Sequence, residues 1–262
     1  MIESIINIDD FFKKYTKKIL ETAKSETEYI HIKRKIDHSY RVANLSVRIG
    51  KSLNLNEHDI SLIKTMSLIH DIGRFTQFIK YKTYDDLLSE NHALLSAKII
   101  EKENILSNYN EEEQKLILKA VSLHNKKDLP DNLNEKEFIF STILRDADKI
   151  DFFKSMVDII PNIPTKEQAI FYSNKENKEV ISDDVYNLII QRKTVDNNLL
   201  KTVLDKKVRA LGFITSDINH KESLKIIYEN DYIDKIYKLM PQNIQTNTIY
   251  SMTKKYVKDK IN

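Results

Sequence analysis

The stretch Leu62-Ile63-Lys64-Thr65-Met66-Ser67-Leu68-Ile69-His70-Asp71-Ile72-Gly73-Arg74 decides the fold. Its large apolar residues recur at spacings of three and four, which is the period of one face of an α-helix. The capping residue Asn56 precedes the stretch, and Gly73 is of the type that ends helices. The pattern predicts a helix over 57–72 whose last residues, His70 and Asp71, adjoin a buried apolar stripe.

The same helical period continues on both sides of this stretch, and the alternating patterns typical of strands are nearly missing. Further helices are predicted over 8–24, 29–53, 91–104, 111–125 and 136–160. Pro161 and Pro164 then break the chain, and three to five amphipathic helices follow, one of them starting at Ser182-Asp183-Asp184. We therefore expect an all-α fold in two parts: a helical bundle over 1–160 and a helical C-terminal extension over 165–262 that packs on it.

The composition excludes several classes of site. The chain has 262 residues but only 3 glycines, which are too few for a Gly-rich phosphate loop or a Gly-x-Ser-x-Gly nucleophile turn. Because there is no cysteine, the chain has no disulfide, no thiolate nucleophile and no cysteine-ligated metal. Any chemistry must use other side chains or a metal bound by them.

Charge and hydropathy indicate neither a nucleic-acid nor a membrane partner. The net charge is +3, and the excess of lysine lies in the last nine residues, as at the polar end of a terminal helix. No segment approaches the roughly 20 apolar residues of a membrane span. Residues 1–14 also lack the apolar run of a signal peptide. We expect a cytoplasmic protein and leave open whether it forms a homo-oligomer.

Four of the seven histidines and one aspartate lie on predicted apolar faces. Residues three, four and seven apart share a face of a helix, and by that spacing the neighbours of these five are mostly apolar. The five are His38, His70, His92, His124 and Asp146. Burying a polar group without a partner costs about 1–3 kcal/mol. A shared cation would satisfy all five at once, so the pattern favours a metal site.

The other three histidines have simpler explanations. His31 shares its face with Arg34 and Lys35, so we expect it to be solvated. His58 lies in the first turn of a predicted helix, and His220 stands at a helix start in the extension. None of the three is expected to bind metal.

The motif formed by His38, His70-Asp71 and Asp146 resembles that of the HD superfamily of metal-dependent phosphohydrolases, which are all-helical enzymes. The resemblance covers about residues 29–160. His92 and His124 fall between the His-Asp pair and the last aspartate, where the two-metal branch of the superfamily has two more histidine ligands. The resemblance therefore implies an HD-type helical bundle that holds two metal ions.

The resemblance also implies a ligand set and a reaction. One ion would be bound by His38, His70, Asp71 and Asp146, and the other by His92 and His124, with Asp71 bridging both. A histidine-rich site suits a divalent transition metal (Fe, Mn, Co, Ni or Zn) better than Mg or Ca. The implied reaction is hydrolysis of a phosphoester bond in a small phosphorylated metabolite such as a nucleotide, by a metal-bridging hydroxide.

Polar residues beside these ligands are candidates for contact with the substrate. Arg74, four residues after His70, can bind a phosphate in bidentate fashion and is, with Asp71, an expected catalytic residue. Weaker candidates for substrate binding are Arg41, Asn125, Lys126, Asp148 and Lys149. The stretch 81–86 is expected to be a polar loop near the site.

Two other functions stay open at this stage. The same ligand set occurs in members of the superfamily that are di-iron oxygenases, and an HD-type core can also serve as a non-catalytic metal- or nucleotide-binding signalling module. The chain lacks the adjacent His-His pair and the Gly-Tyr-Pro motif of the cyclic-dinucleotide phosphodiesterases. A cyclic dinucleotide is therefore not the expected substrate.

Overall fold

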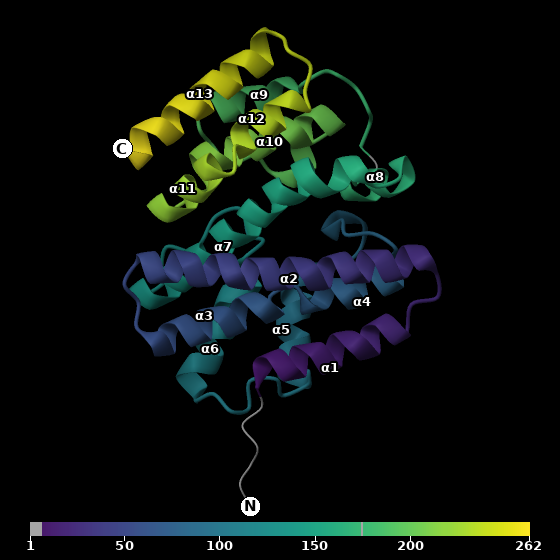
Figure 1. Cartoon of the computed structure of the whole chain (residues 1–262), viewed down its shortest axis with the longest axis vertical. Helices are drawn as coiled ribbons and strands as arrows, with labels where there is room; N and C mark the ends of the chain where they lie inside the picture. Colours follow the sequence, from purple (N-terminus) through teal and green to yellow (C-terminus); the bar gives the residue numbers. More distant parts are fainter. Residues whose placement is uncertain (1–6, 174) are drawn as a thin grey trace, which may run out of the picture. The chain divides into compact units, whose positions relative to one another are not determined.

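The computed structural model describes residues 7–173 and 175–262, and the described residues are mainly α-helical (Figure 1). In chain order the helices are α1 (Ile8–Glu21), α2 (Glu26–Ser52), α3 (Glu57–Ile69), α4 (Ile72–Tyr81), α5 (His92–Lys102), α6 (Glu111–Leu123), α7 (Glu135–Lys154), α8 (Thr165–Phe171), α9 (Asp183–Ile190), α10 (Val203–Ser216), α11 (Lys221–Glu229), α12 (Tyr232–Lys238) and α13 (Ile244–Ile261). The described residues form no strand beyond one isolated bridge between Glu176 and Thr202. The predicted all-α class is confirmed.

Several helices of the first unit begin where the sequence supplies a capping side chain. Asn56 Oδ1 accepts a hydrogen bond from the Asp59 amide at 2.8 Å and caps α3. Asn91 caps α5 in the same way, and Asn110 forms a reciprocal capping box with Glu113 at the start of α6. These bonds satisfy amide groups that have no partner within the helix. The caps set the starts of the two helices that carry or precede His92 and His124.

The break between α3 and α4 differs from the prediction. Instead of one helix over 57–72, α3 ends at Ile69 and a new helix, α4, begins at Ile72. Gly73 therefore lies in the first turn of α4 and does not end a helix. A Cβ at this position would stand 2.7 Å from the Ser96 amide nitrogen and 2.8 Å from the His92 carbonyl oxygen. Glycine is required here because α4 and α5 approach closely, a tertiary contact that a local pattern does not reveal.

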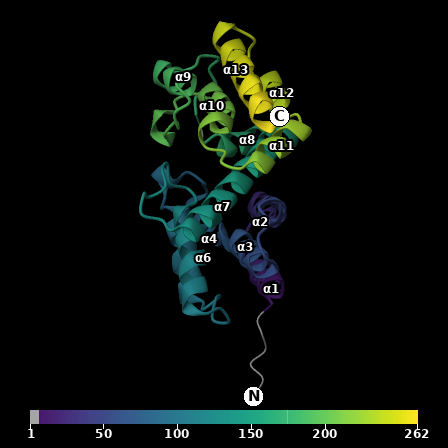
Figure 2. The ribbon, with the colours of Figure 1, turned by 90° about the vertical axis from the view of Figure 1, so that its left-hand side faces the viewer.

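The described chain divides into two compact units, Met1–Leu144 and Arg145–Asn262, and the boundary falls within α7. In the first unit α2 packs along α3, and α5 contacts both α4 and α6 (Figures 1 and 2). Fully buried side chains such as Ile32, Ile49, Ile63 and Met66 fill the space between these helices. The predicted boundary between 160 and 165, and the packing of the extension on the bundle, stay predictions.

The described part of residues 165–262, which belongs to the second unit, forms six α-helices, α8 to α13, where three to five were predicted. The number is higher because Asp231, with φ of 54°, adopts a left-handed conformation that separates α11 from α12. The predicted start at Ser182-Asp183-Asp184 is confirmed by α9. Within this unit α10 packs against α13 and α9, around buried Val208, Leu211 and Ile249.

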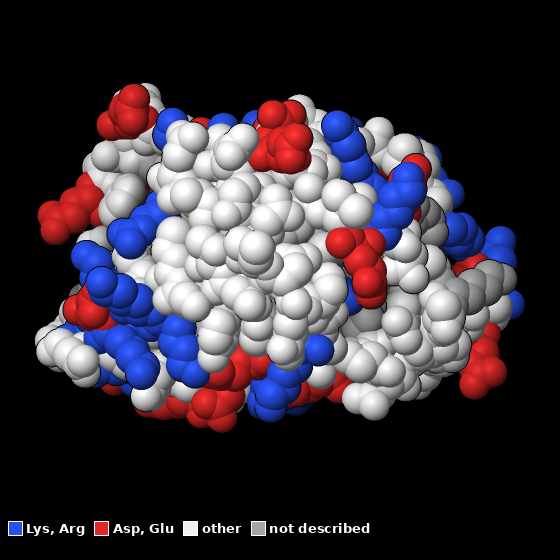
Figure 3. Space-filling view, turned by 90° about the horizontal axis from the view of Figure 1, so that it is seen from above, with Lys and Arg blue, Asp and Glu red and all other residues white. Residues whose placement is uncertain are grey.

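Uncharged residues are concentrated in one part of the second unit. The run from Leu239 to Thr253 contains no charged residue, and Ile244 within it is 84% exposed. Figure 3 shows a face whose centre is free of charged side chains, with lysine, arginine, aspartate and glutamate around the margin. None of the helices in the described chain combines the length and the apolar character needed to span a bilayer.

Candidate metal centre

Four chain segments of the first unit bring their imidazoles to one aspartate. His38 lies in the middle of α2, His70 and Asp71 form the turn between α3 and α4, His92 is the first residue of α5, and His124 directly follows α6. All five side chains are buried, with exposed fractions of 7% or less. The helix packing described above therefore gathers residues that are up to 86 positions apart in sequence.

Asp71 is the common neighbour of the four imidazoles. Its Oδ2 lies 3.4 Å from His38 Nε2 and 3.7 Å from His70 Nε2. Its Oδ1 lies 3.6 Å from His92 Nε2 and 3.7 Å from His124 Nε2. These separations are longer than good hydrogen bonds. They are close to the distance of about 3.4 Å between two ligand atoms that each lie about 2.1 Å from a tetrahedral metal ion.

The same residues form two candidate ligand groups. One consists of His38, His70 and Asp71, and the other of Asp71, His92 and His124, with the donor atoms of each group within 4.8 Å of one another. Asp71 belongs to both. The described part of the first unit thus holds two adjacent sets of donors that share one carboxylate, which is an arrangement suited to a pair of metal ions.

Hydrogen bonds at the Nδ1 atoms orient three of these imidazoles. His70 Nδ1 lies 2.7 Å from the Ser67 carbonyl oxygen, and His124 Nδ1 lies 2.7 Å from the Val121 carbonyl oxygen. His92 Nδ1 lies 2.6 Å from Asp86 Oδ2. Because carbonyl and carboxylate oxygens only accept, each Nδ1 donates, and each neutral imidazole then presents an Nε2 lone pair. Metal-binding histidines are oriented in this way.

The contact between His92 and His124 tests whether a metal fits. Their Nε2 atoms are 2.9 Å apart, and with both protons on Nδ1 the two lone pairs face one another. Burial, together with the charge of Arg74, lowers the pKa of His92 to about 3, so a proton does not bind this nitrogen at neutral pH. A cation beside the two nitrogens relieves this repulsion. The donor set therefore fits a divalent metal.

Positive charge surrounds the Asp71 carboxylate. Lys35 Nζ donates a hydrogen bond to Asp71 Oδ2 at 2.8 Å, and Arg74 Nε lies 3.6 Å from Oδ1. Burial alone would raise the pKa of Asp71, but the Lys35 ammonium and the surrounding imidazoles outweigh it and hold the pKa well below its usual value. Asp71 is therefore ionised, as a metal ligand must be.

Arg74 lies at the site, as the sequence predicted, but its contacts extend further than expected. Nη1 donates to Gln77 Oε1 at 2.7 Å, to the Tyr84 carbonyl oxygen at 2.6 Å and to Asp86 Oδ1 at 3.1 Å. The side chain is 14% exposed. Arg74 thus connects the two candidate ligand groups to the segment that follows α4, which the sequence predicts to be a polar loop near the site.

Asp146 lies in the second unit, on α7, with a fully buried side chain. Its carboxylate accepts hydrogen bonds from the Asn219 amide at 3.0 Å, from Asn219 Nδ2 at 3.0 Å and from the His220 amide at 2.9 Å. These bonds hold the segment at the start of α11. The role of Asp146 as a metal ligand stays a prediction.

The remaining candidates for substrate binding have varied surroundings. Asn125 Nδ2 donates to Asp86 Oδ2 at 3.0 Å and to Asn91 Oδ1 at 3.1 Å, so it braces the site. Lys126 is exposed, and Arg41 is half-buried one turn after His38. Asp148 and Lys149 follow Asp146 on α7, and burial, with the charge of Arg145, lowers the pKa of Lys149 to about 8. Their contacts with a substrate stay predictions.

The prediction that His31 is solvated is wrong. The residue is only 4% exposed, and its ring stacks on Phe78 with a centroid distance of 4.5 Å. The rings of Phe78 and Tyr84 cover this end of α2, which the charged neighbours of His31 in sequence did not indicate. By contrast, His58 is exposed in the first turn of α3 and pairs with Glu113, and His220 stands at the start of α11.

Two residues of the site were not found from the sequence. Lys35 stands three residues before His38 and so shares its helix face, but it also shares the face of His31, where the pattern predicts solvated side chains. Asp86 belongs to the stretch 81–86 that the sequence predicts near the site, but no local pattern singled it out, because this stretch has no helical period. Its position follows only from the way this segment folds back over α4.

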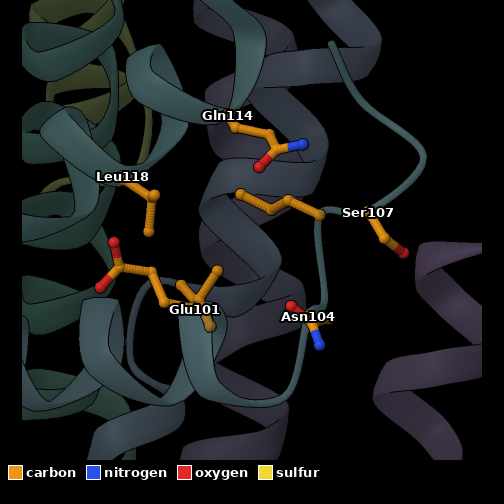
Figure 4. A pocket seen from close by; sticks show the side chains of 7 residues that line it. Glu101, Asn104, Ser107, Gln114 and Leu118 are labelled. Carbon is orange, nitrogen blue, oxygen red and sulfur yellow. The ribbon is translucent and has the colours of Figure 1, made fainter. Parts of the chain in front are cut away.

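A separate pocket of about 270 Å³ lies between α5 and α6, away from the histidines (Figure 4). Its lining includes Glu101, Asn104, Ser107, Gln114 and Leu118. None of the residues that line it is a histidine or aspartate. It is therefore distinct from the candidate metal centre.

Comparison with known proteins gives one family. Residues 36–152 match the family model described as the HD domain. No curated protein and no solved structure matches the chain. The matched range contains both candidate ligand groups of the first unit, so the resemblance found in the sequence is confirmed.

Proposed function

We propose, from the premise that residues 36–152 form an HD domain, that this chain is a metal-dependent phosphohydrolase acting on a small phosphorylated metabolite such as a nucleotide. HD domains are in general metal-dependent hydrolases. The observation that carries the proposal is the pair of ligand groups that share Asp71. A buried carboxylate surrounded by four imidazoles, three of them oriented by hydrogen bonds at Nδ1, is the arrangement expected where a cation binds.

The residues that would hold metal are His38, His70 and Asp71 for one ion, and Asp71, His92 and His124 for a second. Imidazole nitrogens favour a transition metal such as Fe, Mn, Co, Ni or Zn. Bound there, such ions supply Lewis-acid chemistry, which polarises a phosphoryl oxygen and acidifies water.

The protein's own side chains supply the charge that a phosphate needs. Lys35 and Arg74 both lie beside Asp71, and their side chains are 22% and 14% exposed, so each is accessible from solvent. Both also lie near the Tyr84 ring, with Lys35 Nζ 5.5 Å and Arg74 Cζ 5.8 Å from its centroid. The Tyr84 ring stabilises both cations, and a phosphoryl group bound beside Asp71 would contact them.

The test is metal stoichiometry followed by phosphate release. We expect about two transition-metal ions per chain by elemental mass spectrometry, in protein purified without chelator and without a histidine tag. Asp71→Ala should lose metal and phosphate release from a panel of phosphorylated metabolites. Asp59→Ala is the matched control, because it removes the same charge from a residue whose partners are Asn56 and Lys136 near the surface.

Other outcomes distinguish the alternative functions. Iron in the protein with oxygen consumption and no phosphate release would indicate a di-iron oxygenase. Binding of metal and nucleotide without turnover would indicate a signalling module. Loss of metal in both variants, or in neither, contradicts the assignment of Asp71 as the shared ligand.

A further inference from the structure

The Asp86 carboxylate accepts four hydrogen bonds, all from side chains around the candidate metal centre. Oδ2 accepts from His92 Nδ1 at 2.6 Å and from Asn125 Nδ2 at 3.0 Å. Oδ1 accepts from Gln77 Nε2 at 2.9 Å and from Arg74 Nη1 at 3.1 Å. The Gln77 and Asn125 amide nitrogens and the Arg74 guanidinium can only donate, so each Asp86 oxygen accepts at least one hydrogen bond whichever way the His92 contact runs.

These contacts decide the direction of the hydrogen bond to His92. Three of the four neighbours reach the Asp86 oxygens through nitrogens that can only donate, so both oxygens act as acceptors. In its contact with His92 the carboxylate is therefore also the acceptor, and the proton is on Nδ1. Asp86 is thus the group that decides which nitrogen of His92 carries the proton.

The position of His92 in its helix explains why a side chain is needed. His70 and His124 stand at the C-terminal ends of helices, and each uses the carbonyl oxygen three residues earlier, of Ser67 and Val121. His92 is the first residue of α5, so no helical carbonyl precedes it. The acceptor must come from outside the helix, and Asp86, six residues earlier, supplies it.

We propose that Asp86 is a positioning residue that holds His92 in the tautomer with its proton on Nδ1, so that Nε2 is available as a metal ligand. The tautomer is a property of the metal-free protein, whereas the consequence for metal binding rests on the proposed function. Outer carboxylates of this kind fix the ring and raise the basicity of the ligand, and removing one typically lowers metal affinity about 10–100-fold.

The first measurement is the tautomer of His92 in metal-free protein, read from nitrogen chemical shifts by NMR. The His92 signal is identified by its absence in His92→Gln. We expect the Nδ1-protonated form in the unaltered chain and a shift toward the Nε2-protonated form in Asp86→Ala, because Nε2 can then donate to Asp71 or His124. Finding Nε2 protonated in the unaltered chain overturns the proposal without any variant.

The second measurement is the affinity for Zn²⁺ or Mn²⁺, by titration against a chelator. Asp86→Ala should weaken the second ion by about 10–100-fold and leave the ion at His38, His70 and Asp71 nearly unchanged. Asp85→Ala is the matched control, because it removes the same charge one residue away, where Asp85 only caps the turn through the Leu87 amide. Equal affinities in the two variants contradict the proposal.

The two measurements separate failure of the inference from failure of the proposed function. If the protein binds no metal but His92 is protonated on Nδ1 only when Asp86 is present, Asp86 positions His92 and the phosphohydrolase proposal is wrong. If metal binds but the tautomer of His92 does not depend on Asp86, the phosphohydrolase proposal stands and Asp86 has no such role.

Discussion

At the scale of single residues, the donors around a buried carboxylate indicate its role. Asp71 is surrounded by imidazole nitrogens at 3.4–3.7 Å, which are too far for strong hydrogen bonds and well placed for a shared ion. Asp146 is surrounded by the amides of Asn219 and His220 at 2.9–3.0 Å. The first carboxylate is suited to a metal, and the second stabilises the start of α11 within its own unit.

This difference predicts how Asp146→Asn behaves in metal-free protein. In the unaltered protein the Asp146 carboxylate accepts hydrogen bonds from Asn219 and His220. In the variant, the side-chain NH₂ group at position 146 would face some of these N–H donors and could not accept from them. We therefore expect the free energy of unfolding to fall by about 1–3 kcal/mol. Urea unfolding in the presence of chelator measures it. Asp158→Asn is the control, because Asp158 pairs with the partly exposed Lys154. Unchanged stability of the metal-free Asp146→Asn variant would show that these hydrogen bonds contribute little.

At the scale of elements, the crossing of α4 and α5 positions the site. Gly73 N donates to Ser96 Oγ at 2.9 Å, and the missing side chain lets the start of α4 lie against the first turn of α5. Asp71 precedes this crossing and His92 begins α5, so the distance between these two candidate ligands depends on how closely the helices approach.

Gly73→Ala should separate the two helices. The new Cβ would meet the Ser96 amide and the His92 carbonyl, which are backbone atoms and cannot rotate away. We expect a loss of about 1–3 kcal/mol in stability, typical of overpacking, and weaker metal binding. Thermal unfolding and metal titration test this. Gly50→Ala is the control, because its Cβ would meet only side-chain methyl ends, Ile60 Cδ1 at 2.8 Å and Ile63 Cδ1 at 3.3 Å, which can move aside, and alanine favours a helix interior. Equal effects of the two substitutions would contradict the role of the close crossing.

At the scale of the whole molecule, both candidate ligand groups shared by Asp71 belong to the first unit, Met1–Leu144. The second unit has its own core and its own polar network at the start of α11. A metal that binds only the folded state stabilises that state by mass action.

We therefore expect metal ions that prefer imidazole ligands to raise the stability of the protein more than ions that prefer oxygen ligands. Zn²⁺ or Mn²⁺ at about 100 times its dissociation constant should add about 2.7 kcal/mol, whereas Ca²⁺, which prefers oxygen ligands, should add little. Differential scanning calorimetry measures the shift in Tm. Hydrogen exchange should show the added protection in α3, α5 and α6. An equal shift with Ca²⁺ would exclude a histidine-based site.

The sequence by itself determined the fold class, the start of α3 capped by Asn56 and the burial of His38, His70, His92 and His124. It could do so because the helical period and capping are local, so a residue's face and its cap follow from neighbours a few positions away. The HD motif lies on these helices, and its resemblance to the family followed from the same local pattern.

Only the tertiary structure decided how these helices meet. It showed that Asp71 is the common neighbour of four imidazoles, that Lys35 and Asp86 join the site, that His31 is covered by Phe78, and that Gly73 serves a crossing and does not end a helix. These contacts join segments far apart in the chain or lie in a segment without helical period. They are set by packing, which no local pattern encodes.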